Sequence, residues 1–423
     1  MSRIAVIGTG YVCLTTGACF AHLSHQVVCA DVDADKVDRL RRGEIPILEP
    51  GLDKIVAHGM AEGRLSFVLG AAAAAADCEF AYLCVPTPQG PDGRADLSYV
   101  EAAAREIGAV LPSQAIVVNK STVPVGSTHV VERAMGRTDV TVVSNPEFLR
   151  EGSAVHDFLH PDRIVVGTED QSAAMRVGDL FAGVPAPLIV TDPASAETIK
   201  YAANSFLAAK ISFVNAIAAV CEAVGADVND VVLGMGSDPR IGDRFLQPGP
   251  GWGGSCFPKD TRALVRIAED AGYSFDLLKG VIEVNEQQFE RMADKVEAMA
   301  GGSLDGVRVA LLGLTFKANT DDLRDSPALE VARRLAGRGA SLVAYDPAVH
   351  TGIGDIEVAS SAYEALEDAG VAVVLTEWDE FRWLDWDRVA AAMATPRLVD
   401  CRNLLDPPAM RRRGFVYEGL GRP

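Results

Sequence analysis

The chain has 423 residues, 48% of them apolar, and a formal net charge of −19. This length exceeds what one hydrophobic core usually holds, so two or three domains are expected. The acidic excess argues against nucleic acid or an anionic membrane as a partner, and without a run of 18 or more apolar residues no membrane span is expected. The N-terminus lacks the pattern of a signal peptide. The eight cysteines are scattered singly, without metal-ligand spacing, so we expect no metal site and a reducing, cytoplasmic location.

Strand-like and helix-like segments alternate from the first residues onward. Apolar runs predict strands at 3–7, 26–31, 80–85, 115–120 and 141–144, and helices are predicted between them, including 11–23 and the alanine-rich 71–76. Near-continuous apolar strands that alternate with helices are typical of a parallel, doubly wound sheet. The N-terminal part of the chain is therefore predicted to be an α/β domain.

A long helix is expected to begin at Asp192-Pro193. Asp as the N-cap and Pro at the first helical position form a strong start signal, and neither glycine nor proline interrupts the chain up to about Ala223. About thirty helical residues would span roughly 45 Å, so we expect this helix to connect domains and to contribute to a subunit interface.

A second strand–helix alternation follows the loop signal Gly301-Gly302-Ser303. Strands are predicted at 307–312, 341–345, 371–375 and, as the last one, 397–399, with a helix over 326–338. The predicted fold is thus two doubly wound, parallel-sheet α/β units joined by a long central helix.

A glycine turn follows the first predicted strand and opens the first helix, in Gly8-Thr9-Gly10-Tyr11-Val12-Cys13. In a dinucleotide-binding fold the first glycine makes the tight turn, and the second lets the backbone approach a pyrophosphate at the helix N-terminus. Cys13 replaces the third glycine, which normally allows close packing of helix and strand, so its effect on NAD affinity stays open. Asp31 ends the next strand, where an acid binds ribose hydroxyls and favours NAD over NADP.

The main candidate for a covalent nucleophile is Cys256, within Gly253-Gly254-Ser255-Cys256-Phe257-Pro258-Lys259-Asp260. Pro258 belongs in the first turn of a helix, which places Cys256 at the helix N-terminus with Lys259 nearby, and both features favour the thiolate. We expect the glycines to leave room for a substrate to reach the sulfur. Asp260 could act as a base or hold a water. A lone cysteine is more often inert core packing, but its glycine neighbours and its place at a helix start favour reactivity.

Lys200 and Asn204 stand at positions i and i+4 of the long helix and project from one face. Among apolar neighbours, a lysine either snorkels to water or serves a site, and the residues alone slightly favour snorkelling. Loops after strands are further candidates because ligands bind at strand carboxyl ends, namely 121–126, 145–152 and 315–317. The last has only Gly313 before it, so the second unit lacks a dinucleotide fingerprint and is expected to bind something else.

Taken together, these motifs resemble the nucleotide-sugar dehydrogenases, the UDP-glucose/GDP-mannose dehydrogenase family, over essentially the whole chain. The matching segments, in order, are 8–12, Pro46–Leu52, Ser121–Gly126, Asn145–Gly152, Lys200–Asn204, Arg240–Gly242, Gly253–Asp260, Phe316-Lys317 and Arg324–Ser326. The resemblance implies an N-terminal NAD-binding Rossmann domain over 1–191, a central helical dimerisation domain with the catalytic cysteine over 192–300, and a C-terminal Rossmann-like UDP-sugar domain over 301–423.

The resemblance also implies an activity. UDP-glucose would be oxidised to UDP-glucuronate by two hydride transfers to NAD, through a thiohemiacetal and a thioester on Cys256, in a homodimer or higher oligomer. Lys200 and Asn204 would stabilise developing oxyanions. Asp260, Glu147 and Thr122 would position or activate water, and which of them is the base stays open.

The implied ligand contacts form two sets. Those with the cofactor are Gly8, Gly10, Tyr11, Val12, Asp31, Lys36, Thr87, Thr122, Glu151, Lys259 and Arg324. Those with the sugar nucleotide are Glu147, Phe148, Leu149, Arg150, Glu151, Lys200, Asn204, Phe245, Leu246, Gln247, Pro248, Gly249, Gly253 and Lys317, with Arg240 reaching the active site of the neighbouring subunit. Trp252 stands where the family usually has a smaller aromatic.

Three alternatives remain. A relative that oxidises GDP-mannose or a UDP-N-acetylhexosamine would share the cysteine, lysine and asparagine, although 94–97 and Phe245–Gly249 look like the glucose group. A catalytically silent nucleotide-sensing scaffold has no reason to hold Lys200, Asn204, Cys256 and Asp260 together. A dehydrogenase that releases the aldehyde would form one NADH per sugar.

Overall fold

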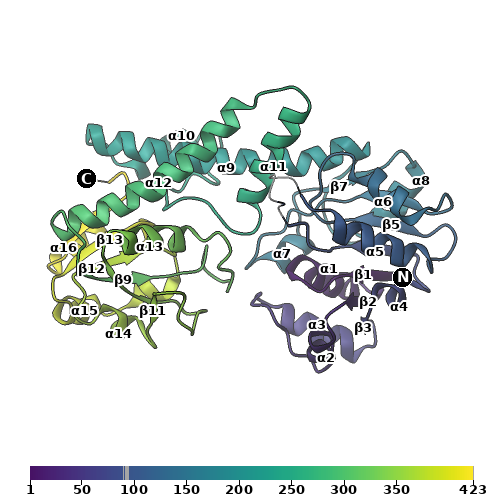
Figure 1. The fold of residues 1–423 in the computed structure, drawn as a ribbon, viewed down its shortest axis with the longest axis horizontal. Coiled ribbons are helices and arrows are strands. Elements are labelled where there is room, and N and C mark those ends of the chain that lie inside the picture. Colours follow the sequence, from purple (N-terminus) through teal and green to yellow (C-terminus); the bar gives the residue numbers. More distant parts are fainter. Residues whose placement is uncertain (89, 91–94, 423) are drawn as a thin grey trace. The chain divides into compact units, whose positions relative to one another are not determined.

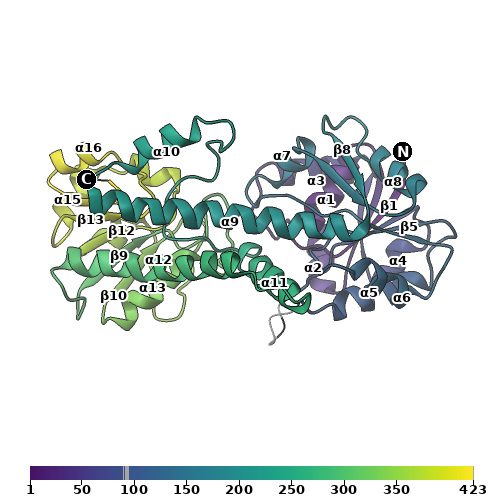
Figure 2. The same ribbon diagram turned by 90° about the horizontal axis from the view of Figure 1, so that it is seen from above.

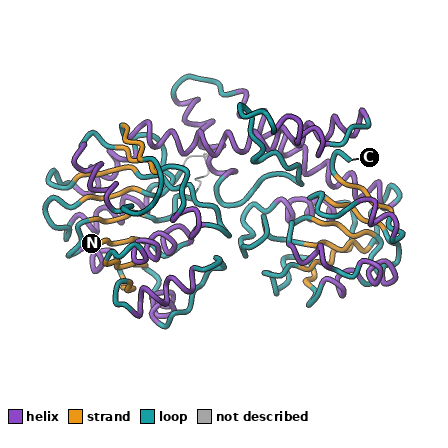
Figure 3. Tube along the Cα trace, turned by 180° about the vertical axis from the view of Figure 1, so that it is seen from behind, coloured by secondary structure: helices purple, strands orange, loops and turns teal. Residues whose placement is uncertain are grey.

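A computed structural model of the chain describes residues 1–88, 90 and 95–422. The chain forms two compact units, Met1–Ala203 and Asn204–Pro423, and the boundary between them falls within the long helix α9 (Pro193–Val224). Each unit contains its own sheet, with strands flanked by helices (Figure 3).

The first unit is built on a sheet with the strand order β3-β2-β1-β4-β5-β6-β7-β8. Neighbouring strands pair in parallel except β6 and β7, which meet in an antiparallel pair at Ser144 and Gly167. The order reverses beside β1, where ligands bind in open α/β sheets. The strands are β1 (Arg3–Ile7), β2 (Gln26–Asp31), β3 (Leu65–Leu69), β4 (Phe80–Leu83), β5 (Ile116–Asn119), β6 (Thr141–Ser144), β7 (Ile164–Gly167) and β8 (Leu188–Thr191).

Helices cover both faces of this sheet (Figure 1), which confirms the doubly wound prediction. Alternate side chains of β1 point to opposite faces, so Ile4 and Val6 join one hydrophobic core while Ala5 and Ile7 join the other. The first core includes α1 (Tyr11–His22), α2 (Ala34–Arg41), α3 (Leu52–Ala61), α7 (Ala154–Leu159) and α8 (Gln171–Asp179). The second includes α4 (Ala71–Ala75), α5 (Ser98–Gly108) and α6 (Ser127–Met135).

The second unit holds a parallel sheet with the order β11-β10-β9-β12-β13-β14. Its strands are β9 (Arg308–Leu312), β10 (Ser341–Tyr345), β11 (Glu357–Val358), β12 (Val371–Val374), β13 (Arg397–Asp400) and β14 (Val416–Gly419). The prediction that 397–399 is the last strand is wrong, because β14 follows and pairs with β13. The helices around this sheet are α13 (Pro327–Gly337), α14 (Ala362–Leu366), the 3-10 helix η1 (Asp379–Trp383), α15 (Trp386–Ala392) and α16 (Pro407–Arg412).

Helix α9 begins as predicted. Asp192 caps it by accepting hydrogen bonds from the Ser195 N–H at 2.8 Å and the Ser195 hydroxyl at 2.6 Å. In the second unit α12 (Asp276–Ala300) runs beside the later part of α9 (Figure 2), and the Ser212 hydroxyl donates to the Val281 carbonyl across that contact. The helices α10 (Val228–Gly236) and α11 (Phe257–Asp270) complete this helical part.

By length and hydropathy alone, α9 is a candidate for crossing a membrane, and 33% of its most apolar window is buried. The sequence predicted no membrane span because Glu197 and Lys200 interrupt the apolar run in this segment. The core helix of a soluble protein also has this length and hydropathy.

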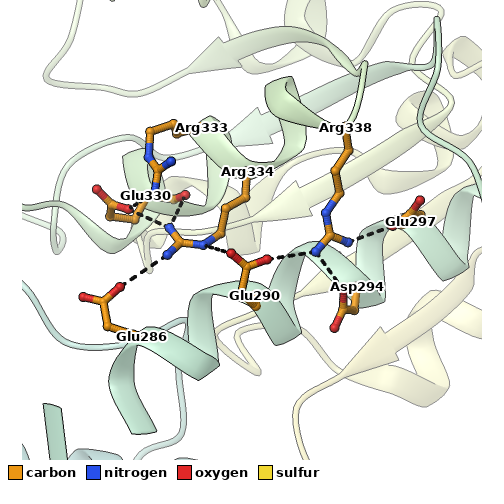
Figure 4. Close-up of polar contacts among 8 residues, drawn as sticks. All are labelled: Glu286, Glu290, Asp294, Glu297, Glu330, Arg333, Arg334 and Arg338. Carbon is orange, nitrogen blue, oxygen red and sulfur yellow. Dashed lines mark hydrogen bonds and ion pairs between the residues drawn. The ribbon is translucent and has the colours of Figure 1, made fainter. Parts of the chain in front are cut away.

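An ion-pair network joins α12 to α13 (Figure 4). The Arg334 guanidinium contacts Glu290 at 2.7 Å, Glu286 at 3.3 Å and Glu330 at 2.6 Å, with only 10% of its side chain exposed. Arg338 shares Glu290 and also pairs with Asp294 and Glu297. Isolated surface pairs contribute little, but a network of partly buried arginines holds its geometry better, so α12 is anchored to the second sheet.

Candidate active site

The glycine turn lies between β1 and α1, as predicted. Gly8 has a φ of +108°, and a Cβ there would lie 2.8 Å from the Cys84 carbonyl oxygen, so only glycine fits. Helix α1 begins at Tyr11, directly after Gly10, and its unpaired N–H groups therefore face the turn. This geometry fits a pyrophosphate.

Asp31 ends β2 beside this turn. Its Oδ2 accepts hydrogen bonds from the Thr9 N–H at 3.0 Å, from the Thr9 hydroxyl, and from Lys36 Nζ at 3.2 Å. Burial alone would raise the pKa of Asp31, but these hydrogen bonds and the Lys36 ammonium hold it below its ordinary value. The acid is therefore ionised at neutral pH, as an acceptor for ribose hydroxyls must be.

Cys13 fills the third-glycine position without separating α1 from the sheet. Its buried Sγ donates to the Cys84 carbonyl oxygen at 2.5 Å. The close contact of helix and strand falls one turn later, at Gly17, where a Cβ would overlap Cys29 Sγ. The task usually given to the third glycine is thus performed by Gly17.

We expect Cys13→Gly to leave the KM for NAD⁺ within about threefold of wild type, whereas Gly17→Ala is expected to lower the free energy of unfolding by about 1–3 kcal/mol through overpacking. Thermal unfolding and NAD⁺ titration of both variants test this. Loss of NAD⁺ binding in Cys13→Gly, or full stability in Gly17→Ala, would contradict the assignment.

Lys200 is buried, so the snorkelling interpretation is wrong. Only 3% of the residue is exposed, and its Nζ donates to Glu147 Oε1 at 2.8 Å. Glu147 lies just after β6, and its Oε2 accepts the Leu149 N–H at 2.6 Å. Burial by itself would raise the pKa of Glu147, but the Lys200 ammonium, the Leu149 hydrogen bond and the charge of Lys120 hold it below its ordinary value. The first unit thus contains a buried, charged lysine–carboxylate pair.

Lys120, just after β5, belongs to the same buried group and was not predicted from the sequence. Its Nζ lies 3.4 Å from Asn145 Oδ1 and 5.9 Å from the centre of the Phe158 ring. Burial lowers the pKa of Lys120, and the nearby Lys200 lowers it further. A lysine that directly follows a buried apolar strand is the sequence signal that could have identified it.

The predicted loop residues of the first unit also lie together. The Thr87 hydroxyl donates to the Thr122 carbonyl at 2.8 Å, which joins the ends of β4 and β5. The Gly152 N–H donates to the Tyr11 hydroxyl at 2.5 Å and to Glu49 Oε2 at 2.7 Å. Glu49 therefore connects the Pro46–Leu52 motif to the 145–152 loop, a role that the sequence alone did not reveal.

The remaining loop residues hold the loop itself in place. Arg150 pairs with Asp157 at 2.6 Å. The Phe148 ring lies near two cations, with the Arg163 guanidinium 3.7 Å and the Lys200 ammonium 5.5 Å from its centre. The predicted contact Glu151 lies in the turn before α7.

In the second unit Cys256 is the N-cap residue of α11, and Pro258 lies in the first turn, as predicted. Cys256 is partly exposed, whereas the other seven cysteines are buried. Burial raises the pKa of Cys19 and of Cys78 to about 12, so those thiols stay protonated at neutral pH. Cys256 is therefore the accessible thiol, and its place at a helix start favours reactivity.

Asp260 lies in the first turn of α11 and is fully buried. Its Oδ2 accepts from Asn204 Nδ2 at 2.6 Å, and its Oδ1 accepts from Lys259 Nζ at 2.8 Å. The structure thus brings together three of the predicted residues. A carboxylate held in this way fixes the orientation of the Asn204 amide.

The glycines before Cys256 are needed for packing within the second unit, while the expected access of a substrate to the sulfur stays a prediction. A Cβ on Gly253 would overlap the Asp325 carbonyl oxygen and lie 2.8 Å from Pro327 Cδ. Gly254 has a φ of +79°, and a Cβ there would lie 2.8 Å from the Phe316 ring. The absent side chains let the cysteine loop pack against the 316–327 segment of the same unit.

The other predicted residues of this unit lie in loops. Arg324 pairs with Asp322 and Arg240 with Asp238, each at 2.6 Å, and the Arg240 side chain is 87% exposed. Lys317 Nζ lies 5.4 Å from the centre of the Phe316 ring. Within the Phe245–Gly249 segment, Leu246, Pro248 and Gly249 are buried, and Gln247 is exposed. Trp252, which the sequence placed beside this segment, is buried, and Arg94 lies outside the described residues.

Asp346 directly follows β10, in the position that corresponds to Asp31 in the first unit, but it is less accessible than Asp31. It is fully buried, and its Oδ2 accepts the N–H groups of Leu314 and Thr315 and the indole N–H of Trp378. Its complete burial distinguishes it from the partly exposed Asp31, which agrees with the absence of a dinucleotide fingerprint after β9.

Arg402, after β13, is a second residue that the sequence analysis missed. It donates to the Leu375 carbonyl at 2.8 Å and to the Phe316 carbonyl at 3.3 Å, and its Nη1 lies against Gly249. It thereby connects the Phe316-Lys317 loop to the Phe245–Gly249 segment. An arginine after a buried strand, at the sheet edge where ligands bind, was the available signal.

Comparisons with known proteins agree with this arrangement. Three models of the UDP-glucose/GDP-mannose dehydrogenase family match the chain: the NAD binding domain at 2–184, the central domain at 194–287 and the UDP binding domain at 310–407. The chain is 49% identical to a UDP-glucose 6-dehydrogenase of Rhizobium meliloti, with 100% of both chains covered. It is 45% identical to UDP-glucose 6-dehydrogenase TuaD of Bacillus subtilis, over 100% of this chain and 94% of that protein.

A solved structure agrees as well. A UDP-glucose dehydrogenase from the archaeon Pyrobaculum islandicum superposes with a TM-score of 0.92 at 40% identity, covering 100% of this chain and 98% of that one. The chain therefore belongs to the UDP-glucose/GDP-mannose dehydrogenase family.

Proposed function

We propose that the chain is an NAD-dependent UDP-glucose 6-dehydrogenase, which oxidises UDP-glucose to UDP-glucuronate. The observation that supports this most is a pair of buried contacts from two residues of α9 that lie one turn apart. Lys200 contacts Glu147, and Asn204 contacts Asp260. Burying charges costs several kcal/mol each unless they are paired, and a scaffold that only binds nucleotides needs no such arrangement. Relatives named UDP-glucose 6-dehydrogenase match over the whole chain.

Oxidation of a primary alcohol to an acid removes four electrons, so the aldehyde must be held between two steps. Bound NAD⁺ supplies the hydride acceptor for each oxidation. The Cys256 thiolate bonds to the aldehyde carbon and gives a thiohemiacetal, whose oxidation leaves a thioester. Water then breaks the carbon–sulfur bond, which releases the carboxylate and returns the thiolate.

The polar groups have complementary tasks in this scheme. The Lys200 ammonium and the Asn204 amide donate to the oxyanions that form at the sugar carbon, as preorganised donors should. Glu147 and Asp260 each hold one of these donors in place. Together with Thr122, they also position the water for the final hydrolysis.

The three-part organisation belongs to the same proposal. Residues 1–191 bind NAD, 192–300 carry the cysteine and form the subunit contact, and 301–423 bind the UDP moiety. The Asp31 turn supports the first assignment, and the match of 310–407 to the family's UDP binding domain supports the third.

A product assay tests this proposal. The protein is incubated with NAD⁺ and UDP-glucose, GDP-mannose or a UDP-N-acetylhexosamine, and NADH and the uronate are quantified. Two NADH and one UDP-glucuronate per UDP-glucose are expected. Turnover of GDP-mannose in place of UDP-glucose, or one NADH with free aldehyde, would contradict the proposal.

A second copy of the chain is proposed to cover an apolar stripe on α9. Phe206, Phe213 and Val220 are 67%, 52% and 55% exposed, and their spacing of seven places them along one side of the helix. Monomeric proteins rarely expose such a stripe. In this assembly the exposed Arg240 would reach the active site of the neighbouring copy.

We also propose a cytoplasmic location, because eight free cysteines suit a reducing compartment.

We expect the double variant Phe206→Glu, Phe213→Glu to be monomeric in size-exclusion chromatography with light scattering, and to lose activity with the dimer. Leu277→Glu, an exposed apolar residue on α12, is the matched control. A wild-type protein that is monomeric, or that binds lipid vesicles through this stripe, would contradict the assembly.

A further inference from the structure

The backbone between α10 and α11 in the second unit is irregular yet buried. Residues 248–252 are buried outside any helix or strand, and Pro248 and Pro250 have no N–H to donate. Buried peptide groups without a strand or helix partner need hydrogen bonds from elsewhere. Side chains of α9 and α12 supply them on two sides.

Gly249 is held at both of its peptide groups. Its N–H donates to Asn215 Oδ1 on α9 at 2.9 Å, and its carbonyl accepts from Gln288 Nε2 on α12 at 2.8 Å. The two amides therefore fix the residue that ends the Phe245–Gly249 segment.

Trp252 is held in the same way, three residues nearer to the nucleophile. Its N–H donates to Asn285 Oδ1 at 2.8 Å, and its carbonyl accepts from Asn285 Nδ2 at 2.9 Å. Its indole N–H donates to Ser212 Oγ at 2.9 Å, and that hydroxyl donates to the Val281 carbonyl. One asparagine thus satisfies both peptide groups of Trp252.

The four polar residues form two pairs with helical spacing. Ser212 and Asn215 are three apart on α9, and Asn285 and Gln288 are three apart on α12, so each pair faces the loop from one helix. All four are 4% exposed or less. Gly251 fits just as closely, since its φ is +133° and a Cβ would lie 2.5 Å from the Phe289 ring. A buried hydrogen-bond network of this kind specifies one geometry.

We propose that Gln288 and Asn285 are positioning residues, which set Cys256 relative to the sugar-nucleotide segment Phe245–Gly249. The proposal rests on the role assigned to Cys256 above. Only three residues separate Trp252 from Cys256, so a shift at Trp252 is transmitted to the sulfur. Misplacement of a reacting group by about 1 Å can cost 10²-fold in rate.

The test uses variants of the full chain. Gln288→Met keeps the side-chain length but removes the donor to Gly249. Gln287→Met is the matched control, because Gln287 is the exposed neighbour on the same helix and bonds to Glu283. Gln288→Glu adds a pH readout, because only the protonated carboxyl can donate to the Gly249 carbonyl. Its activity relative to wild type should therefore rise as the pH falls.

We expect Gln288→Met to lower kcat for UDP-glucose at least about 10-fold, with the KM for NAD⁺ within twofold, while Gln287→Met behaves as wild type. A kcat within twofold of wild type in Gln288→Met would overturn the proposal. If Gln288→Met does not fold, Gln288→Glu decides, and a relative activity that stays flat with pH would also overturn it. Cys256→Ala is measured alongside. If the Cys256→Ala variant keeps full turnover, Cys256 is not the nucleophile and the proposed function fails. If Cys256→Ala is inactive but Gln288→Met has wild-type kcat, only the positioning role of Gln288 is overturned.

Discussion

Replacing Cys256 with alanine is expected to lower kcat for uronate formation by roughly 10³- to 10⁶-fold, the range seen when a covalent nucleophile is removed. Cys256 is the N-cap residue of α11 and the partly exposed one among the eight cysteines. Without its sulfur the aldehyde has no covalent anchor for the second oxidation. NADH formation under saturating UDP-glucose and NAD⁺ is the measurement.

The matched control is Cys221→Ala, which removes a buried thiol from α9 in the same unit. This variant should retain wild-type kcat and should unfold at a slightly lower temperature. If Cys256→Ala forms two NADH per sugar at the normal rate, the nucleophile has been misassigned.

Replacing Lys200 with methionine is expected to damage both activity and stability. Loss of an oxyanion donor costs about 10²- to 10³-fold in kcat. Both side chains of the Lys200–Glu147 pair are 5% exposed or less, and breaking a buried ion pair by removing one partner costs about 3–5 kcal/mol. The double variant Lys200→Met, Glu147→Gln should recover much of the stability without recovering kcat. Recovery of activity in the double variant would show that the pair is only structural.

The Lys200–Glu147 pair also predicts how the stability of the wild type and of Lys200→Met changes with pH. In the wild type the pKa of Glu147 lies below its ordinary value, despite a burial that would raise it, because of Lys200, Leu149 and Lys120. Its stabilising contribution is therefore present at neutral pH and is lost as the pH falls through the folded-state pKa. In Lys200→Met the burial of Glu147 is no longer offset by the ammonium and raises the pKa of Glu147. The variant therefore loses stability as the pH rises and this buried carboxyl ionises. The difference in melting temperature between variant and wild type should shrink from about pH 8 to pH 5. A constant difference would contradict the pairing.

The elements that the sequence predicted well are those that local chemistry determines. The start of α9 follows from Asp192 and Pro193, and the lack of glycine or proline up to about Ala223 agrees with its last residue, Val224. Most strands of the two sheets follow from short apolar runs between helical segments, although β3, β7, β8 and β11 were not predicted. The strand β14 was missed because Val-Tyr-Glu-Gly is short and polar, and only its pairing with β13 makes it a strand.

The site was predictable in its residue types but not in its packing. Lys200 lies in a helix with apolar residues around it, so only the fold could show that it meets Glu147. The space above Gly253 and Gly254 is taken by Asp325 and Phe316. These contacts join residues more than fifty positions apart, and no local pattern encodes them.

The most direct test of the account is the mass of the peptide that contains Cys256 during a single turnover. Protein is mixed with UDP-glucose and NAD⁺, quenched with acid at successive times, digested and analysed by mass spectrometry. With Cys256 as the nucleophile, this peptide should transiently gain the mass of the oxidised sugar nucleotide and lose it on treatment with hydroxylamine, while other cysteine peptides stay unchanged. Formation of two NADH with the Cys256 peptide unmodified at every time would contradict it.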